Sequence, residues 1–320
     1  MPPSTARRRI FRIVQWAFVV VVLVFAGWAL HDQWRAVQTA LRQAHPRWSL
    51  LLLSGLIVFA AYAALVEAWR LVLRGWHYNL PIFDAVYIWF VSNLGKYVPG
   101  KVWTISVMAV MLQRRGVPPA SAATASLLIS LIYTLVGFLV AAATGASALS
   151  LPPVVVAAIV FLGAALLLAP HLLPRITTLA GRLLGREIAI PTPSTRTIIL
   201  TAAISAVAWV LYGIAFRVFT LGLLGSAPGS LALYTAVYTG SYLIGFVAIF
   251  APGGIGVRET VMTSALTGAG MAIGPALLVG VASRLWITVL EILPAALLLL
   301  IRPLRREKAD APPEVASDAR

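Results

Sequence analysis

Long apolar runs alternate with short polar segments along most of the chain. A helix needs about 20 apolar residues to cross the hydrocarbon core of a bilayer. Runs of this length lie at residues 10–30, 49–73, 120–143, 153–173, 197–224 and 273–301. We therefore expect six full transmembrane helices.

Two further apolar stretches, residues 81–113 and 231–268, are interrupted near their middle. The first contains Pro99 and Gly100, and the second contains Pro252, Gly253 and Gly254. Because proline lacks an N–H and glycine is flexible, one helix ends at such a point and another begins. Each stretch is therefore predicted to form two half-helices, as a re-entrant hairpin or as two short tilted crossings.

The two interrupted stretches occupy corresponding places in the two halves of the chain. Three predicted full spans separate them, and an odd number makes them enter the membrane from opposite faces. This is the geometry of an inverted repeat. The predicted fold is an all-α polytopic membrane protein with six full transmembrane helices, two broken or re-entrant half-helix pairs and an inverted repeat.

Composition agrees with a membrane protein and excludes an ordinary soluble one. Hydrophobic residues make up 60% and charged residues 11% of the chain, against about 45–50% and 25% in soluble domains. The net charge of +15 comes from short clusters between apolar runs, so we expect an anionic membrane surface as partner and no nucleic acid. With no cysteine and four scattered histidines, no metal or cofactor is expected.

The basic clusters predict the topology. If each interrupted stretch returns to the side it entered from, 17 positive residues face the cytoplasm and three face the opposite side. The positive-inside rule favours this arrangement, with both termini cytoplasmic in a bacterial inner membrane. We expect a cytoplasmic tail at 1–9, a transmembrane domain at 10–304 that begins with an uncleaved anchor, and a disordered cytoplasmic tail at 305–320.

The first interruption carries basic residues inside an apolar segment. Lys96 and Lys101 flank Pro99 and Gly100, and a lysine at the membrane centre costs about 2.5–3.5 kcal/mol. A half-helix beginning at Lys101 presents free N–H groups and a partial positive charge, which together suit a phosphate headgroup. Alternatively, both lysines snorkel to the cytoplasmic interface. Asn93 and Arg114 complete this candidate site.

The second interruption is rich in glycine. Gly254 and Gly256 allow backbone N–H groups to approach a ligand closely, and Arg258 adds a planar donor suited to phosphate. Glu259 falls in the first turn of the following helix, where a carboxylate stabilises the helix N-terminus. Proton coupling is the functional alternative for Glu259, since a carboxylate in a dry cavity exchanges protons near neutral pH.

Three further interpretations concern the full spans. Arg284 and Glu291 are seven residues apart in the last span, so they share a face that would line a substrate path. Glu67 and Arg70 are three residues apart and are expected to pair. Tryptophans near the predicted interfaces are expected to anchor the helices; they include Trp48, Trp76 and Trp103.

The interruptions contain two motifs: Leu94-Gly-Lys-Tyr-Val-Pro-Gly-Lys101, with Arg114 and Gly116 downstream, and Ala251-Pro-Gly-Gly-Ile-Gly-Val-Arg-Glu259. Both resemble motifs of the lysylphosphatidylglycerol synthase transmembrane-region family. The resemblance extends over residues 12–302. It implies a lipid flippase-like fold that moves aminoacylated phospholipid in the fused members, with isoprenoid-linked, glycan-linked or hopanoid-type lipids suggested for relatives. The positions implied to be functional are Gly95, Tyr97, Pro99, Gly100 and Arg114 in the first motif, and Pro252, Gly253, Gly254, Gly256 and Glu259 in the second.

The fused members continue into a soluble aminoacyl-transfer domain, whereas this sequence ends 19 residues after Ile301. We therefore expect that this chain alone does not synthesise lysylphosphatidylglycerol.

The sequence favours an integral membrane transporter, without enzyme activity, that moves a phosphate-bearing phospholipid or isoprenoid-linked lipid between leaflets. One alternative is a scaffold or accessory subunit for a lipid- or glycan-modifying enzyme. Another is an intramembrane enzyme acting on lipid headgroups, with Glu259 or Glu291 as general base. A small-solute permease is a further alternative, because half-helix dipoles also bind small anions.

Overall fold

The computed structural model describes residues 46–97, 103–148, 193–248 and 256–309, with isolated positions at 38, 42, 44, 152–154, 157, 158, 161 and 254. Helices make up almost all of this part of the chain, and it contains no strand. The elements are α3 (Trp48–Gly75), α4 (Ile82–Asn93), η1 (Leu94–Tyr97), α5 (Trp103–Gln113), α6 (Pro119–Ala148), α8 (Thr195–Leu224), α9 (Leu231–Val247), α10 (Val257–Gly268) and α11 (Ile273–Ala309).

Four helices in the described part of the chain are long and apolar enough to cross a membrane: α3, α6, α8 and α11. They coincide with four of the six predicted spans, which confirms the prediction of an all-helical membrane protein. The spans predicted at residues 10–30 and 153–173 lie outside the described residues, apart from a few isolated positions in the second. The count of six full spans therefore stays a prediction.

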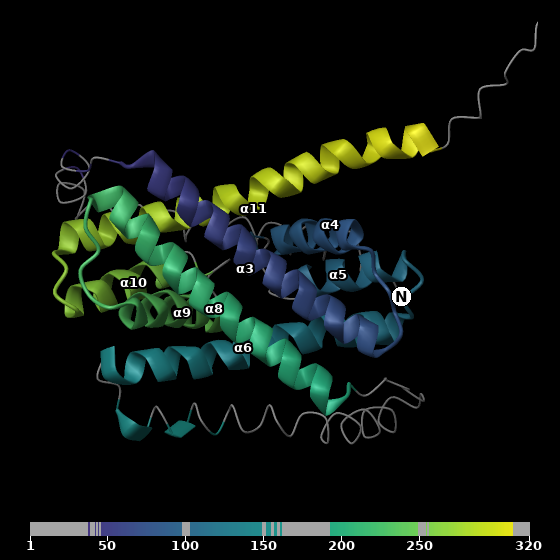
Figure 1. The fold of residues 1–320 in the computed structure, drawn as a ribbon, viewed down its shortest axis with the longest axis horizontal. Helices are drawn as coiled ribbons and strands as arrows, with labels where there is room; N and C mark the ends of the chain where they lie inside the picture. The colour runs from purple at the N-terminus through teal and green to yellow at the C-terminus, as the bar shows by residue number, and fades with distance from the viewer. Residues whose placement is uncertain are drawn as a thin grey trace, which may run out of the picture.

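The long helices α3 and α8 pack side by side along the middle of the molecule (Figure 1). At one end the backbone N–H of Arg47 donates to the carbonyl of Gly222 at 2.8 Å. At the other end, a Cβ added to Gly75 would lie 3.1 Å from Oγ1 of Thr197. The first contact joins the start of α3 to the end of α8, and the second joins the end of α3 to the start of α8. The two helices therefore run antiparallel.

Each interrupted stretch forms two helices, as predicted. In the first, α4 has 12 residues and α5 has 11, so each is about 17–18 Å long at 1.5 Å per residue, well short of the roughly 30 Å hydrocarbon core. In the second, α9 has 17 residues and α10 has 12. We call residues 94–102 and 248–256 the two breaks.

The helix α4 ends earlier than the position of Pro99 predicts. It ends at Asn93, and the chain continues as a four-residue 3-10 turn, η1. Gly95 explains this change of path, because a Cβ at this position would lie 2.8 Å from the backbone N of Thr104. The turn therefore packs directly against the backbone at the start of α5.

The outer ends of each helix pair, away from the break, lie together. Asp84 near the start of α4 forms an ion pair with Arg115 just after α5. At the second stretch, residues before α9 and after α10, including Ser226 and Met271, line one cavity of about 350 Å³. Figure 1 shows α4 and α5 toward one end of the long helices and α9 and α10 toward the other.

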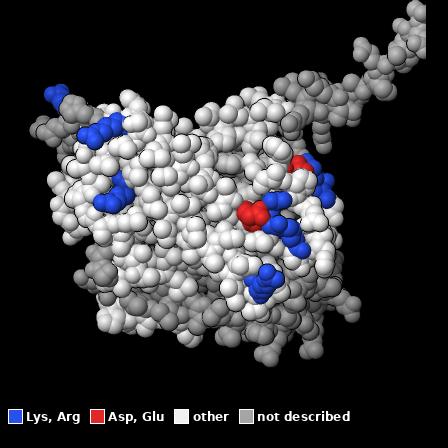
Figure 2. Space-filling view, viewed as in Figure 1, with Lys and Arg blue, Asp and Glu red and all other residues white. Residues whose placement is uncertain are grey.

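The surface fits a membrane-embedded protein. On the face drawn in Figure 2, charged side chains lie toward the two ends of the molecule, and the wide surface between them carries none. Trp48 is 71% exposed and Trp103 is also exposed, as expected for anchors, whereas Trp76 is buried in the core. The last helix runs to Ala309, five residues into the predicted C-terminal tail, and the rest of that tail lies outside the described residues.

Candidate functional site

A cavity of about 160 Å³ lies where the two breaks meet in the middle of the molecule. Lys96 lines it from the first break and Gly254 from the second. The helices α3, α4, α5, α6, α8, α9 and α11 contribute the rest of its wall. Segments far apart in the sequence therefore form a single site.

The close approach of the second break depends on glycine. Gly254 has a φ of +72°, which side chains rarely adopt. A Cβ there would lie 3.0 Å from both the Cα and the carbonyl oxygen of Gly245. Two glycines are thus in backbone contact at the cavity, where a larger residue would separate the break from α9.

The cavity contains a buried ion pair. The ammonium of Lys96 on η1 contacts Oε1 of Glu291 on α11. The hydroxyl of Tyr62 on α3 donates to the same oxygen at 2.6 Å. Exposure of the Glu291 side chain is only 6%, and that of Lys96 is 24%. The pairing accounts for both charges, because a buried charge is tolerated only when it is paired and hydrogen-bonded.

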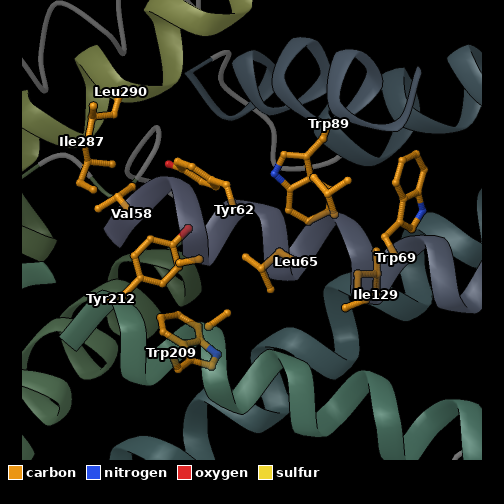
Figure 3. Packing of buried hydrophobic residues seen from close by; sticks show 14 of the residues in the cluster. Val58, Tyr62, Leu65, Trp69, Trp89, Ile129, Trp209, Tyr212, Ile287 and Leu290 are labelled. Atoms are coloured by element: carbon orange, nitrogen blue, oxygen red, sulfur yellow. The ribbon is translucent and has the colours of Figure 1, made fainter. Parts of the chain in front are cut away.

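Tyrosine rings form much of the cavity wall. The rings that line it come from four helices; they are Tyr62, Tyr133, Tyr212, Tyr238 and Tyr242. Tyr212 and Tyr238 stack with their centroids 5.3 Å apart, and Tyr62 meets Tyr212 edge-on at 5.9 Å. Figure 3 shows Tyr62 above Tyr212, with the α11 residue Ile287 on one side of it and Trp89 of α4 on the other. The wall therefore combines apolar ring faces with hydroxyl groups.

Arg258 lies behind this wall. It stands in the first turn of α10, is 3% exposed, and places its guanidinium carbon 4.7 Å from the ring centre of Tyr238 and 5.4 Å from that of Tyr242. Such cation–π contacts stabilise a desolvated guanidinium. Its Nη2 has no hydrogen-bond partner among the described residues. A positive charge with an unused donor thus adjoins the cavity.

Glu259 caps the helix α10. Its Oε2 accepts a hydrogen bond from the backbone N–H of Gly256 at 2.7 Å, which confirms the capping interpretation. Its Oε1 lies 3.7 Å from Nε of Arg284 on α11, and both side chains are largely buried. The proton-coupling role of Glu259 stays a prediction.

The predicted site residues fall into three groups, apart from Arg114. Those that line the cavity are Asn93, Lys96, Gly254 and Glu291. Those that lie next to it on η1, α10 or α11, or in the turn before α10, are Gly95, Gly256, Arg258, Glu259 and Arg284. Arg114 is exposed just after α5, away from the cavity.

The third group lies outside the described residues. It contains Pro99, Gly100, Lys101, Pro252 and Gly253, together with the side chain of Tyr97. Glu67 and Arg70 form the predicted pair at 2.6 Å, and neither residue lines the cavity. Arg284 and Glu291, which were predicted to share a face of the last span, have different partners. Arg284 contacts Glu259, and Glu291 contacts Lys96.

The sequence motifs do not include the tyrosine wall. Aromatic residues in membrane helices are expected at the interfaces, but Tyr62, Tyr212 and Tyr238 are buried in the core. One signal was present in the sequence: Tyr234, Tyr238 and Tyr242 recur every four residues, which places them on one face of a helix. Tyr62 and Tyr212 have no such spacing, and only the packing of α3 on α8 brings them together.

A comparison with curated proteins finds no relative that matches this chain. A comparison with family models finds one match, described as the lysylphosphatidylglycerol synthase TM region, over residues 13–295. The match includes both breaks, the tyrosine wall and the Lys96–Glu291 pair. The chain therefore belongs to the lysylphosphatidylglycerol synthase transmembrane-region family.

Proposed function

We propose that this protein moves a phosphate-bearing lipid between the two leaflets of a bacterial inner membrane, as a transporter without enzyme activity. Membership of the family supports a role of the membrane domain in lipid handling. The observation that carries the finer proposal is the cavity between the two breaks, because Lys96 and five tyrosines line it inside an otherwise apolar protein, and Arg258 lies directly behind two of these rings.

Charge and polarity of the cavity suit a phosphate group. Intramembrane lysine and arginine are expensive and tend to mark a substrate path. The helix α10 adds the positive end of its dipole at Val257, directly before Arg258. A phosphate between these groups would gain charge-assisted hydrogen bonds that water does not supply there.

Size restricts what enters the cavity. A cavity of about 150 Å³ holds a molecule the size of benzene, and this one measures about 160 Å³. It therefore accommodates a headgroup while the acyl or isoprenoid chains stay in the bilayer. Many large apolar side chains are exposed on the long helices, so chains can remain in contact with lipid during the transfer.

The arrangement of the helix pairs supports a route through the membrane. The Asp84–Arg115 ion pair joins the outer ends of the first pair, which favours a stretch that returns to the side it entered from over a single crossing of the membrane. The shared cavity at Ser226 and Met271 favours the same for the second pair. Two hairpins that enter from opposite faces and meet at one cavity form an inverted repeat, with both termini cytoplasmic.

The experiment is a leaflet-accessibility assay in vesicles that contain the purified protein and a headgroup-labelled lipid. The wild type should expose the inner-leaflet label to an external quencher, with anionic, zwitterionic and isoprenoid-phosphate lipids compared. Lys96→Gln, Lys101→Ala and Arg258→Ala should each slow this at least tenfold without loss of protein abundance. Arg196→Ala, which removes an exposed charge at the start of α8, should leave the rate unchanged.

Two results would reject the proposal. If no labelled lipid becomes accessible with the wild type, with or without an imposed proton gradient, the protein is not a lipid transporter under these conditions, and a role as accessory subunit of a lipid- or glycan-modifying enzyme replaces it. If the variants reduce abundance in parallel with transport, the three basic residues are structural.

A further inference from the structure

The amine of Lys96, the only basic side chain lining the cavity among the described residues, is already paired. Its ammonium contacts Oε1 of Glu291, which is also the only acidic residue lining the described part of the cavity. Any phosphate that binds Lys96 must therefore approach a position that a carboxylate holds. In a site of low dielectric two anions repel strongly at such a distance, so both cannot bind the ammonium in the same manner.

We propose that Glu291 is an internal competitor for the lipid phosphate: its carboxylate occupies Lys96 while the cavity is empty, and the phosphate exchanges with it when the headgroup enters. This inference rests on the proposed transport function and names a residue that determines its specificity.

The surroundings of Glu291 and Lys96 allow the lysine to exchange the carboxylate for a phosphate. Glu291 is on the long helix α11 and accepts a second hydrogen bond from Tyr62 at 2.6 Å, so one neutral donor stays beside the carboxylate when Lys96 leaves. Lys96 is on the four-residue turn η1 and reaches the cavity with a long flexible side chain. The movement required is therefore a shift of the lysine and needs no displacement of a long helix.

The exchange also makes the cavity selective. A headgroup without a negative charge cannot replace the carboxylate as the ionic partner of Lys96. The Lys96–Glu291 ion pair therefore stays intact and keeps such a headgroup out of the cavity. A phosphodiester offers two oxygens that share a negative charge, and a terminal phosphate offers three. Glu291 would thus weaken the binding of every ligand and weaken uncharged ones most, which is specificity by exclusion.

The experiment measures binding to the full chain in an uncharged maltoside detergent by isothermal titration calorimetry. The probe is dihexanoyl phosphatidylglycerol, and its phosphate-free analogue dihexanoylglycerol serves as the second ligand. Glu291→Gln should bind the phosphate probe about tenfold tighter or more, because the carboxylate then no longer competes for Lys96. It should also bind dihexanoylglycerol more tightly than the wild type does, since the carboxylate no longer excludes it.

Matched variants isolate the ion pair. Glu67→Gln removes the same charge from a surface pair with Arg70 and Arg74 and should leave both affinities unchanged. Lys96→Gln should weaken the phosphate probe, and the Lys96→Gln/Glu291→Gln double variant should bind it no tighter than Lys96→Gln alone. Should Glu291→Gln not fold, Glu291→Asp, which retracts the carboxylate by one methylene, should give a smaller gain of the same sign.

The outcomes separate the inference from the function on which it rests. Affinity that is unchanged or weaker in folded Glu291→Gln, or in Glu291→Asp, overturns the competitor role even when the wild type transports lipid. A gain that persists without Lys96 overturns it as well. A gain that depends on Lys96, in a protein that exposes no lipid in the vesicle assay, keeps the phosphate site and rejects transport.

Discussion

At the residue scale, the interior charges and glycines are explained by direct contacts. Lys96 and Glu291 pair at the cavity, Arg284 and Glu259 pair behind it, and Arg258 lies over two tyrosine rings. Glycines stand where backbones touch. Gly95 is the clearest case, since residues 95 and 104 belong to different sides of the first break and are nearly in backbone contact.

Gly95→Ala should therefore destabilise the protein by about 1–3 kcal/mol, the usual effect of overpacking a close contact. The added Cβ would lie 2.8 Å from a backbone nitrogen, which has no flexible end to move aside. Thermal unfolding of the purified protein measures this. Gly240→Ala is the control, because a Cβ on that α9 residue meets nothing within 4 Å; equal losses for both variants would contradict the explanation.

At the scale of elements, the short helices of the two interrupted stretches end inside the protein, whereas the long helices are long enough to cross the membrane. The helices α4 and α5 are each too short to cross the bilayer, and so is α10. They end inside the protein, where their last backbone groups can face a polar cavity in place of lipid. The outer ends of each pair lie together, and one described residue of each break, Lys96 and Gly254, lines the same cavity.

Cysteine accessibility tests the hairpins, and the chain has no native cysteine to interfere. Asp84→Cys and Arg115→Cys, introduced singly, should react with a membrane-impermeant maleimide from the same side of the membrane, because these residues are in contact. Ser226→Cys, at the other end of α8, should react from the opposite side. Labelling of positions 84 and 115 from opposite sides would mean that the first stretch crosses the membrane.

At the scale of the whole molecule, α11 connects the two breaks. Its Arg284 contacts the acid at the start of α10, and its Glu291 contacts the base on η1. One helix therefore holds both halves of the protein through charges of opposite sign, two turns apart.

A double-mutant cycle on Arg284 and Glu259 tests this connection. Glu259→Gln keeps an acceptor for the helix cap but leaves the arginine without its carboxylate, so it should lower the free energy of unfolding by a few kcal/mol. Arg284→Met should have a comparable effect. The double variant should lose clearly less than the two single losses added together, as measured by thermal unfolding; strict additivity would show that the pair does not couple the two helices.

Much of this protein follows from the sequence alone. The apolar runs predict α3, α6, α8 and α11 to within a few residues at most ends, because a membrane span must satisfy its own backbone and be apolar over about 20 residues. Proline and glycine predict both interruptions. The motifs also indicate Lys96, Arg258 and Glu259, since charge inside an apolar segment is costly enough to stand out.

Which of these residues meet follows only from the way the helices pack together. Glu291 and Lys96 are 195 positions apart, and no spacing in the sequence relates them. The tyrosine wall was hidden for a similar reason, since an aromatic residue has the same pattern whether it faces lipid, an interface or a cavity. Local rules determine where helices begin and end, because backbone hydrogen bonds are local; partners across the bundle depend on how the helices pack, which is a property of the whole chain.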